Sequence, residues 1–298
     1  MSLLKDLEIK GRVLFNEPLC RHTTLRIGGP AAVWAEPRDI DELASVFTTA
    51  RRDAMPILVI GGGSNLLVSD QRLPLIAVSL KGAFGNCEAD EEAVVVGAGC
   101  PLQKFILRAI GEGYAGLEFM AGIPGTVGGA IWMNAGAGLQ GPWISDFLKG
   151  VEVLDANATL RYREAKEIGF GYRRSGLSGC VIVQAEFRLK RAAAAGRTDI
   201  YKKFLDEKRR TQDLTSHSAG CIFKNPPDSG LSAAQLIDGC GLKGARVGDA
   251  MVSRIHANFI VNVKNATFVD ATNLIEMVRD TVARERGIRL ETEVEIIR

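Results

Sequence analysis

The sequence predicts an α+β protein, because segments with helix periodicity and segments with strand periodicity follow one another without a regular βαβα alternation. Of the 298 residues, 46% are hydrophobic and 24% are charged, a composition that can fill a globular core. No segment repeats with a period of about 20–50 residues, which excludes a solenoid. At about 150 residues per domain, the length predicts about two domains, or three small ones.

Helices are predicted where a cap precedes apolar residues at helical spacing. The first follows Pro37, where Asp39 and Glu42 have the spacing of a capping box. The second begins near Pro101, a residue that suits a first helical turn. Others are expected over residues 200–210, near Gln235, and over a long segment that ends at Gly287. The apolar faces comprise Ile40, Leu43, Val46, Phe47 and Ala50 in the first helix, Leu102, Phe105, Ile106, Ala109 and Ile110 in the second, and Ala271, Leu274, Ile275, Val278 and Val282 in the last.

Short apolar runs predict the strands. Residues 57–60 predict a buried strand that ends at three glycines. Further strands are expected at 75–80, 93–96, 151–154, 181–189 and 259–263. Apolar residues alternate with Arg and Glu from Ile288 to Ile296, which predicts a final strand. The low-complexity run Arg191–Arg197 is the expected domain boundary.

The charges nearly balance, since 37 Lys and Arg stand against 35 Asp and Glu for a net charge of +2. A nucleic-acid-binding protein usually has a clustered basic excess, so no nucleic-acid partner is expected. Six cysteines, at positions 20, 87, 100, 180, 221 and 240, form no C-x-x-C pair and have no zinc spacing, so no metal site is expected. Unpaired cysteines without a signal peptide indicate a cytoplasmic protein.

The run from Phe119 to Ser145 has no charged residue and is long enough to cross a membrane. It contains seven Gly and two Pro, however, so it predicts a loop-rich ligand site and no membrane helix.

Two glycine-rich segments are candidate ligand sites. Gly61–Leu66 directly follows a predicted strand, and successive glycine N–H groups can form a nest for phosphate, although a plain flexible turn fits equally well. Gly122–Ala130, followed by Met133–Ala137, lets a flat ligand approach the main chain, or forms a tightly packed turn. A third segment, Gly111–Gly116, matches G-x-G-x-x-G but follows a helix, which excludes a Rossmann site.

Motifs along nearly the whole chain carry a family resemblance. In chain order they are Arg21–Ala31, Gly61–Asn65, Leu117–Ala130, Met133–Gly136, Phe170–Arg173, Ser218–Pro226, Gly241–Gly244, His256–Asn262 and Leu290–Val294. In this order they resemble the UDP-N-acetylenolpyruvoylglucosamine reductase family. These flavoenzymes complete UDP-N-acetylmuramate synthesis for peptidoglycan, and so serve cell-wall biogenesis, cell shape and cell division.

The resemblance implies the fold and the cofactors. It implies a two-part FAD-binding domain of the PCMH or vanillyl-alcohol-oxidase-like type, with a C-terminal α+β substrate-binding domain. The corresponding boundaries are 1–80 and 81–192 for the FAD-binding subdomains and 193–298 for the substrate domain, whose last strand, 288–298, returns towards the flavin site. Non-covalent FAD, NADPH as co-substrate and UDP-N-acetylglucosamine enolpyruvate as substrate follow from the same resemblance.

The resemblance also assigns site residues. FAD would be held by Gly61, Gly62, Gly63, Ser64, Asn65, Leu66, Gly122, Ile123, Pro124, Gly125, Thr126, Gly128, Gly129, Ala130 and Asn134. The catalytic residues would be Arg173, Cys221 and Glu293. Asn225, Lys224, His256 and Arg209 would contact substrate. Relatives commonly have serine at the position of Cys221, and a thiol, with a pKa of about 8.5, is the better proton donor.

Two departures from the family pattern are visible. Only about eight residues separate Arg173 from the strand at Val181, so the chain resembles the short type that lacks an inserted tyrosine loop. Gln212-Asp213 stands where relatives usually have Gln-Pro, which we interpret as a loop variation without consequence.

Two other functions stay open at the level of sequence. One is an FAD oxidase or dehydrogenase of the same superfamily with another small substrate. The other is a non-catalytic protein that binds a flavin or a nucleotide sugar. The motifs at Gly220–Pro226 and His256–Asn262 favour the reductase over the oxidase, and the three catalytic positions disfavour the non-catalytic alternative.

Overall fold

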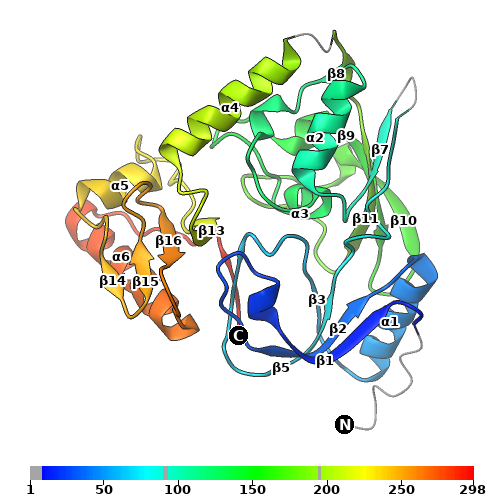
Figure 1. Ribbon diagram of the computed structural model, residues 1–298, viewed down its shortest axis with the longest axis horizontal. Helices are drawn as coiled ribbons and strands as arrows, with labels where there is room; N and C mark the ends of the chain where they lie inside the picture. The colour runs from blue at the N-terminus through cyan, green and yellow to red at the C-terminus, as the bar shows by residue number, and fades with distance from the viewer. Residues whose placement is uncertain (1–8, 90–92, 194–195) are drawn as a thin grey trace. The chain divides into compact units, whose positions relative to one another are not determined.

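A computed structural model describes residues 9–89, 93–193 and 196–298 (Figure 1). Helices and mostly antiparallel strands are mixed along the chain, which confirms the α+β class. The chain forms two compact units. Unit 1 contains the residues up to Glu17, Ala31–Gly62 and Pro74–Leu205, and unit 2 contains Pro18–Pro30, Gly63–Leu73 and Asp206–Arg298. The three predicted domains stay a prediction; Ala194 and Ala195 of the predicted boundary, like the first eight residues, lie outside the described part.

Unit 1 is built on two sheets. The first has the order β1-β2-β5-β3, with β1 (Arg12–Pro18), β2 (Pro30–Glu36), β5 (Leu73–Val78) and β3 (Ile57–Val59), and its β3 and β5 are parallel. The second has the order β10-β9-β11-β7-β6, with β10 (Leu160–Glu164), β9 (Leu148–Leu154), β11 (Val181–Phe187), β7 (Val94–Gly97) and β6 (Cys87–Ala89), and every neighbouring pair is antiparallel.

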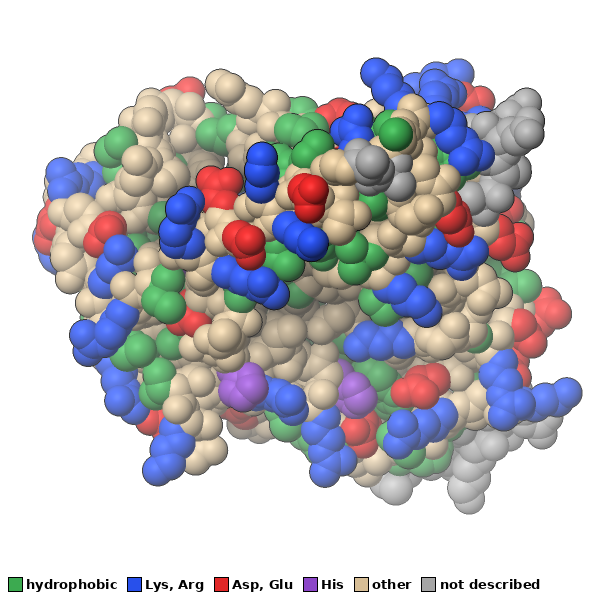
Figure 2. All heavy atoms as spheres, turned by 45° about the horizontal axis from the view of Figure 1, so that its top comes forward, with side chains coloured by type: hydrophobic (Ala, Val, Ile, Leu, Met, Phe, Trp, Pro, Cys, Tyr) green, Lys and Arg blue, Asp and Glu red, His purple; other side chains and the backbone are tan. Residues whose placement is uncertain are grey.

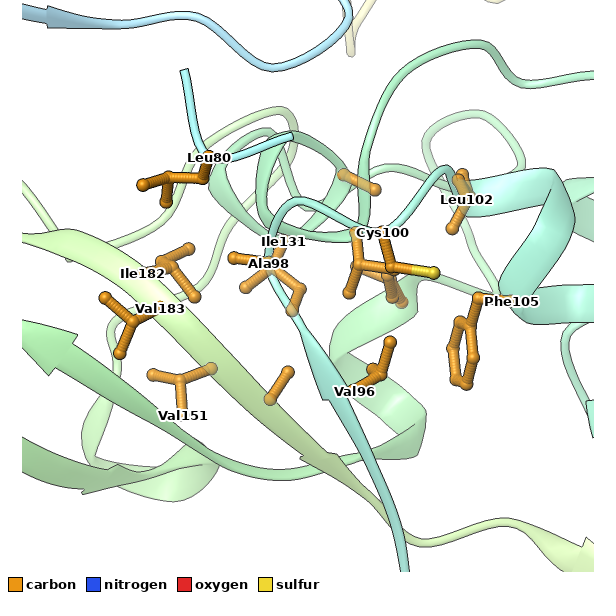
Figure 3. Close-up of a cluster of buried hydrophobic side chains, with 14 of the residues drawn as sticks. Leu80, Val96, Ala98, Cys100, Leu102, Phe105, Ile131, Val151, Ile182 and Val183 are labelled. Atoms are coloured by element: carbon orange, nitrogen blue, oxygen red, sulfur yellow. The ribbon is translucent and has the colours of Figure 1, made fainter. Parts of the chain in front are cut away.

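The core of unit 1 extends from the first sheet and α1 (Ile40–Arg52) to the second sheet and the helices α2 (Leu102–Gly111) and α3 (Val127–Trp132). Figure 3 shows the part of it between the second sheet and these two helices. The five apolar residues predicted for one face of α2 are all buried. Phe105 of this face packs on Phe187 of β11, with ring centroids 5.0 Å apart. Helical spacing therefore identified the buried face correctly.

The helix α1 (Ile40–Arg52) begins where its cap predicts. The carboxylate of Asp39 accepts the backbone N–H of Glu42, at 2.8 Å. The Glu42 carboxylate, however, accepts the N–H groups of Lys10, Gly11 and Arg38 instead of returning to Asp39. The predicted capping box is thus only half formed, because Glu42 ties the helix start to the chain before β1.

Two strand predictions are wrong in part. The run at 57–60 is buried only at Ile60, which is 1% exposed, whereas Val59 is 37% exposed. β3 is an edge strand, which the local sequence does not reveal. The predicted final strand is regular only in β17 (Glu295–Ile297), which pairs in parallel with β4 (Leu66–Val68). Leu290 and Val294 are buried as their alternation predicts, but residues 291–293 pair with residues 222–224 instead.

Besides the parallel pair of β4 and β17, unit 2 contains an antiparallel sheet covered by two helices. The sheet has the order β13-β16-β15-β14, with β13 (His217–Cys221), β16 (Phe259–Asn262), β15 (Ala250–Val252) and β14 (Arg246–Val247). α5 (Ala233–Gly239) and α6 (Phe268–Arg286) form its apolar core together with this sheet. α6 ends at Gly287, whose φ of +69° is the left-handed conformation predicted for that position.

The remaining elements are short or exposed. They are β8 (Tyr114–Ala115) paired with β12 (Lys190–Arg191), the 3-10 segments Leu19–Arg21, Glu118–Met120, Ile144–Phe147 and Ala165–Glu167, and α4 (Arg197–Thr211). In α4 only Tyr201 is buried, and its hydroxyl bonds Gln103 Oε1 at 2.9 Å. On the face shown in Figure 2, Lys and Arg side chains are scattered among Asp and Glu. No helix among the described residues is long and apolar enough to cross a membrane.

Candidate functional site

The glycine loop (Gly61–Leu66) follows β3 and runs into β4. Within the described part of the chain, the backbone N–H groups of Gly61, Gly62 and Gly63 have no acceptor. A Cβ on Gly61 would lie 2.5 Å from Thr126 Oγ1, and one on Gly62 would lie 2.5 Å from the Cα of Gly125. The two predicted glycine-rich segments therefore pack against each other at Gly61 and Gly62, with free N–H groups left for a phosphate.

Gly63 shows that the loop is both a packed turn and a candidate ligand site. Its φ is +64°, and a Cβ would lie 1.9 Å from the carbonyl oxygen of His22. The N–H of Thr24 donates to the Gly63 carbonyl, at 3.1 Å. The loop is therefore a packed turn and not the flexible turn that the sequence also allowed, and the ligand site stays a prediction.

Gln103 organises the glycine run (Gly122–Ala130). Its Oε1 accepts the N–H of Gly122 at 2.9 Å, and its Nε2 donates to the carbonyl of Ile123 at 2.7 Å. Farther along, Thr126 caps α3, and Ala130 lies in the hydrophobic core. Gln103 is not predicted from the sequence, because a single glutamine near a helix start carries no periodic signal.

Asn134 and Arg173 are held together in unit 1. Asn134 is 1% exposed; its Nδ2 donates to the carbonyl of Gly171 at 3.1 Å, and its Oδ1 accepts the N–H of Ser145 at 3.3 Å. Arg173 Nη2 donates to the carbonyl of Gly136 at 3.2 Å, and Arg173 has a φ of +55°. A non-glycine residue in this conformation is uncommon and clusters at functional sites. The buried asparagine therefore fixes the turn that presents Arg173.

Cys221 follows a β-bulge in unit 2. Ser218 pairs with Val261 and Cys221 pairs with Phe259, so β13 has one residue more than β16 between the two pairs. Gly220, within this bulge, has a φ of +73°. A glycine in the left-handed conformation is typical of one bulge class, and bulges redirect side chains near active sites. The Ala-Gly-Cys sequence thus has a local reason: the glycine forms the bulge that orients the half-buried Cys221.

Glu293 lies on the segment that pairs next to Cys221. The backbone N–H of Glu293 donates to the carbonyl of Ile222 at 2.7 Å, and the N–H of Lys224 donates to the carbonyl of Glu291 at 2.8 Å. Of the three alternating glutamates, Glu291 and Glu295 are exposed and Glu293 is half-buried. Unit 2 therefore places Cys221 and the partly buried Glu293 on adjacent segments; their roles in catalysis stay predictions.

The residues predicted to contact the substrate differ in their exposure and in their partners. Lys224 forms an ion pair with Glu291 at 2.5 Å, and Asn225 Oδ1 accepts the N–H of Ala233 at 3.0 Å. Arg209 is exposed on α4 and pairs with Asp206 at 3.4 Å. These side chains already have protein partners, which a substrate phosphate or carboxylate would have to replace.

His256 is partly buried beside Phe259, with ring centroids 4.7 Å apart. Its Nδ1 is buried, and no hydrogen-bond partner is found for it among the described residues. Burial, and secondarily the charge of Lys243, lower the pKa of His256 from its ordinary value. A neutral imidazole holds an anion as a hydrogen-bond donor and not as a cation.

Asp213 corrects the prediction that the Gln212-Asp213 variation has no consequence. The side chain is 7% exposed, and it accepts Ser253 Oγ at 2.8 Å and the N–H of Ser216 at 3.2 Å. It thereby anchors the segment before β13 to the turn after β15. Asp213 also lines a cavity of about 410 Å³ in unit 2 that touches none of the predicted site residues. Among the described residues, no cluster of His, Cys, Asp and Glu could hold a metal.

Comparisons with known proteins place these features in a family. Residues 212–297 match the UDP-N-acetylenolpyruvoylglucosamine reductase C-terminal domain, and residues 30–162 match an FAD binding domain. The UDP-N-acetylenolpyruvoylglucosamine reductase 2 of Symbiobacterium thermophilum is 42% identical over 297 residues, which is 99% of this chain and 94% of that protein. The crystal structure of the UDP-N-acetylenolpyruvylglucosamine reductase from Thermus caldophilus matches with a TM-score of 0.82 and 37% identity, over 98% of this chain and 100% of that one.

A more distant likeness concerns the fold alone. BBE-like 1 from Physcomitrella patens matches with a TM-score of 0.50 and 18% identity, over 64% of this chain and 45% of that one. Together with the FAD binding domain match, it confirms the predicted FAD-binding fold with a separate C-terminal domain.

Proposed function

Because the chain belongs to the UDP-N-acetylenolpyruvoylglucosamine reductase family, we propose that Arg173, Cys221 and Glu293 carry out its reaction on the enolpyruvyl ether. The enzyme is a flavin oxidoreductase that reduces UDP-N-acetylglucosamine enolpyruvate to UDP-N-acetylmuramate with NADPH. The observation that supports the assignment most is the pairing of the Glu293 segment with the residues that directly follow Cys221. Cytoplasmic location, and the lack of metal and nucleic-acid partners, belong to the same proposal.

The glycine loop and the glycine run fit a bound FAD. The free N–H groups of Gly61, Gly62 and Gly63 suit the diphosphate, and the small residues of the run leave a surface that a flat ring can approach. Bound without a covalent link, FAD would be held by these two segments and would supply hydride transfer from NADPH to the methylene carbon of the substrate. The protein's part is to stabilise the charge and to supply the proton.

Arg173 stabilises the negative charge that develops on the substrate. Hydride addition beside a carboxylate produces an enolate-like anion, and a preorganised cation lowers the energy of that state. The turn held by Asn134 presents the guanidinium, so little reorganisation is needed when charge develops. Removal of one such group typically lowers the rate by about 10²–10³.

Cys221 supplies the proton to the carbon next to the carboxylate. The thiol must stay protonated until the anion forms, and it then donates its proton in one step. Glu293, on the adjacent segment, is the alternative proton donor. If Cys221 donates the proton, Glu293 stabilises the groups beside the thiol. We therefore assign the acid role to Cys221 and a supporting role to Glu293.

The first experiment tests the reaction. Purified protein should show a yellow flavin spectrum, and NADPH consumption should depend on added UDP-N-acetylglucosamine enolpyruvate. Consumption that is independent of this substrate would instead support a flavin oxidase or dehydrogenase, and a flavin spectrum without turnover would support a non-catalytic binding protein.

The second experiment tests the acid. Cys221→Ser should retain substantial turnover, whereas Cys221→Ala should still accept hydride but fail to protonate the intermediate. Because an unprotonated intermediate gives the hydride back, net flavin reoxidation by the substrate should also slow in Cys221→Ala. Iodoacetamide and peroxide should inactivate the wild type and spare Cys221→Ser. Turnover of Cys221→Ala at the wild-type rate would assign the proton to Glu293 or water.

A further inference from the structure

Thr24 joins the glycine loop to the strand that carries Cys221. Its backbone N–H donates to the carbonyl of Gly63 at 3.1 Å, and its hydroxyl lies 2.6 Å from the carbonyl oxygen of Ser218. The hydroxyl is also 3.3 Å from the Gly63 carbonyl. A hydroxyl has one hydrogen to donate, so the shorter contact identifies Ser218 as the acceptor. One residue thus holds both segments, with its backbone on Gly63 and its side chain on Ser218.

The position of Ser218 gives this contact its significance. Ser218 is the last residue of β13 in regular register before the bulge, and Cys221 is the first residue after it. A shift of the Ser218 carbonyl therefore moves the start of the bulge and changes the direction of the thiol. Gly63, at the other end, belongs to the loop that would hold the FAD diphosphate.

We propose that Thr24 is a positioning residue that sets Cys221 relative to the glycine loop, and so relative to the cofactor. The proposal rests on the acid role of Cys221 in the proposed function. Thr24 touches neither substrate nor reacting atoms in this assignment; it acts through the Ser218 carbonyl. Loss of its hydroxyl should therefore impair protonation and leave flavin reduction intact.

Thr23 provides a matched control next to it in the sequence. Thr23 is 3% exposed, and its hydroxyl donates to the carbonyl of Ile27 at 3.0 Å, within the same segment. Thr23→Val and Thr24→Val each remove one hydroxyl with little change of shape, so each loses one hydrogen bond. Only the Thr24 bond reaches β13, across 194 positions of sequence.

The test compares both half-reactions of the FAD-loaded enzymes by stopped flow. We expect Thr24→Val to slow flavin reoxidation by substrate about tenfold, and flavin reduction by NADPH by less than about twofold. The solvent isotope effect on reoxidation should rise, because protonation becomes slower. Thr24→Ser should restore the wild-type rate, and Thr23→Val should match it. If Thr24→Val does not fold, as judged by thermal unfolding, Thr24→Ala replaces it with the same expectations.

A double-mutant cycle with Cys221→Ala separates this proposal from the proposed function. If Thr24 acts through Cys221, Thr24→Val has no further effect in the Cys221→Ala enzyme. Additive effects, or equal slowing by Thr23→Val, would overturn the positioning role while the reductase assignment stands. Wild-type turnover by Cys221→Ala alone would instead overturn the acid assignment, and the positioning role with it.

Discussion

The side-chain amide of Asn65 donates a hydrogen bond to the backbone carbonyl of Glu293, at 3.2 Å and across 228 positions of sequence. The backbone N–H of Glu295 donates in return to the carbonyl of Asn65, at 3.0 Å. These two bonds precede the parallel pairing of β4 with β17. The end of the glycine loop and the segment of Glu293 are therefore held in one arrangement within unit 2.

Asn65→Ala should slow flavin reoxidation by substrate about tenfold, and flavin reduction by NADPH less, because Glu293 loses the donor that fixes its backbone. Stopped-flow measurement at saturating FAD checks this. The control is Asn157→Ala, an exposed asparagine whose side chain bonds Arg51 alone among the described residues and which should match the wild type. Equal slowing of both half-reactions by Asn65→Ala would show a role confined to FAD binding.

Gly220→Ala should destabilise the fold by about 1–2 kcal/mol and slow reoxidation by substrate as well. No heavy atom would lie within 4 Å of the added Cβ, so the cost is backbone strain at a φ of +73°. Gly287 has a φ of +69°, and its surroundings are equally open. Gly287→Ala should therefore lower the stability by the same amount and leave turnover normal. Thermal unfolding and stopped flow measure the two effects; slower reoxidation in both variants would contradict a specific role of the bulge.

The folded protein should become less stable in mild acid because of His256. Burial lowers its pKa in the folded protein from the ordinary 6.5, so the unfolded chain takes up the proton at higher pH. The stability that the neutral His256 contributes is fully present above about pH 6.5, the ordinary pKa of histidine. It is lost as the pH falls towards the lower pKa of His256 in the folded protein. Denaturant unfolding between about pH 8 and about pH 5 should show a smaller loss in His256→Gln than in the wild type. An identical pH dependence in the two proteins would contradict the burial of a neutral imidazole.

The cysteines should differ in their reaction with iodoacetamide. Burial raises the pKa of Cys87 to about 11, and burial also raises the pKa of Cys100. At about pH 8 only about one in a thousand Cys87 side chains is a thiolate, the reactive form. Peptide mapping should find half-buried Cys221 modified well before Cys87 and Cys100, and all six cysteines modified after unfolding. Modification of Cys87 as early as Cys221 would refute this order.

Local signals predicted the helices well. The apolar face of α2 and the start of α1 follow from spacing and caps within one segment. The edge position of β3 and the two pairing partners of residues 291–297 depend on segments far away in the chain. Alternation predicted that Leu290 and Val294 are buried, yet it contains no information about which strand they lie beside.

The same limit applies to the candidate site. Glycine-rich loops are visible in a sequence because several glycines are unusual together, and both loops were predicted. The assigned roles of the individual residues stay predictions. Single polar residues such as Thr24 and Gln103, which hold those loops through distant carbonyl and amide groups, give no local pattern. Their importance follows only from the partners that the fold brings to them.

The pairing of β4 with β17 has a consequence for the order of folding. Unit 2 combines three separate segments of the chain, and among the described residues the strand beside β4 is β17, which is far from it in sequence. Closing so long a loop costs conformational entropy before the pairing can repay it. We therefore expect the strand that follows the glycine loop to acquire its partner late in refolding.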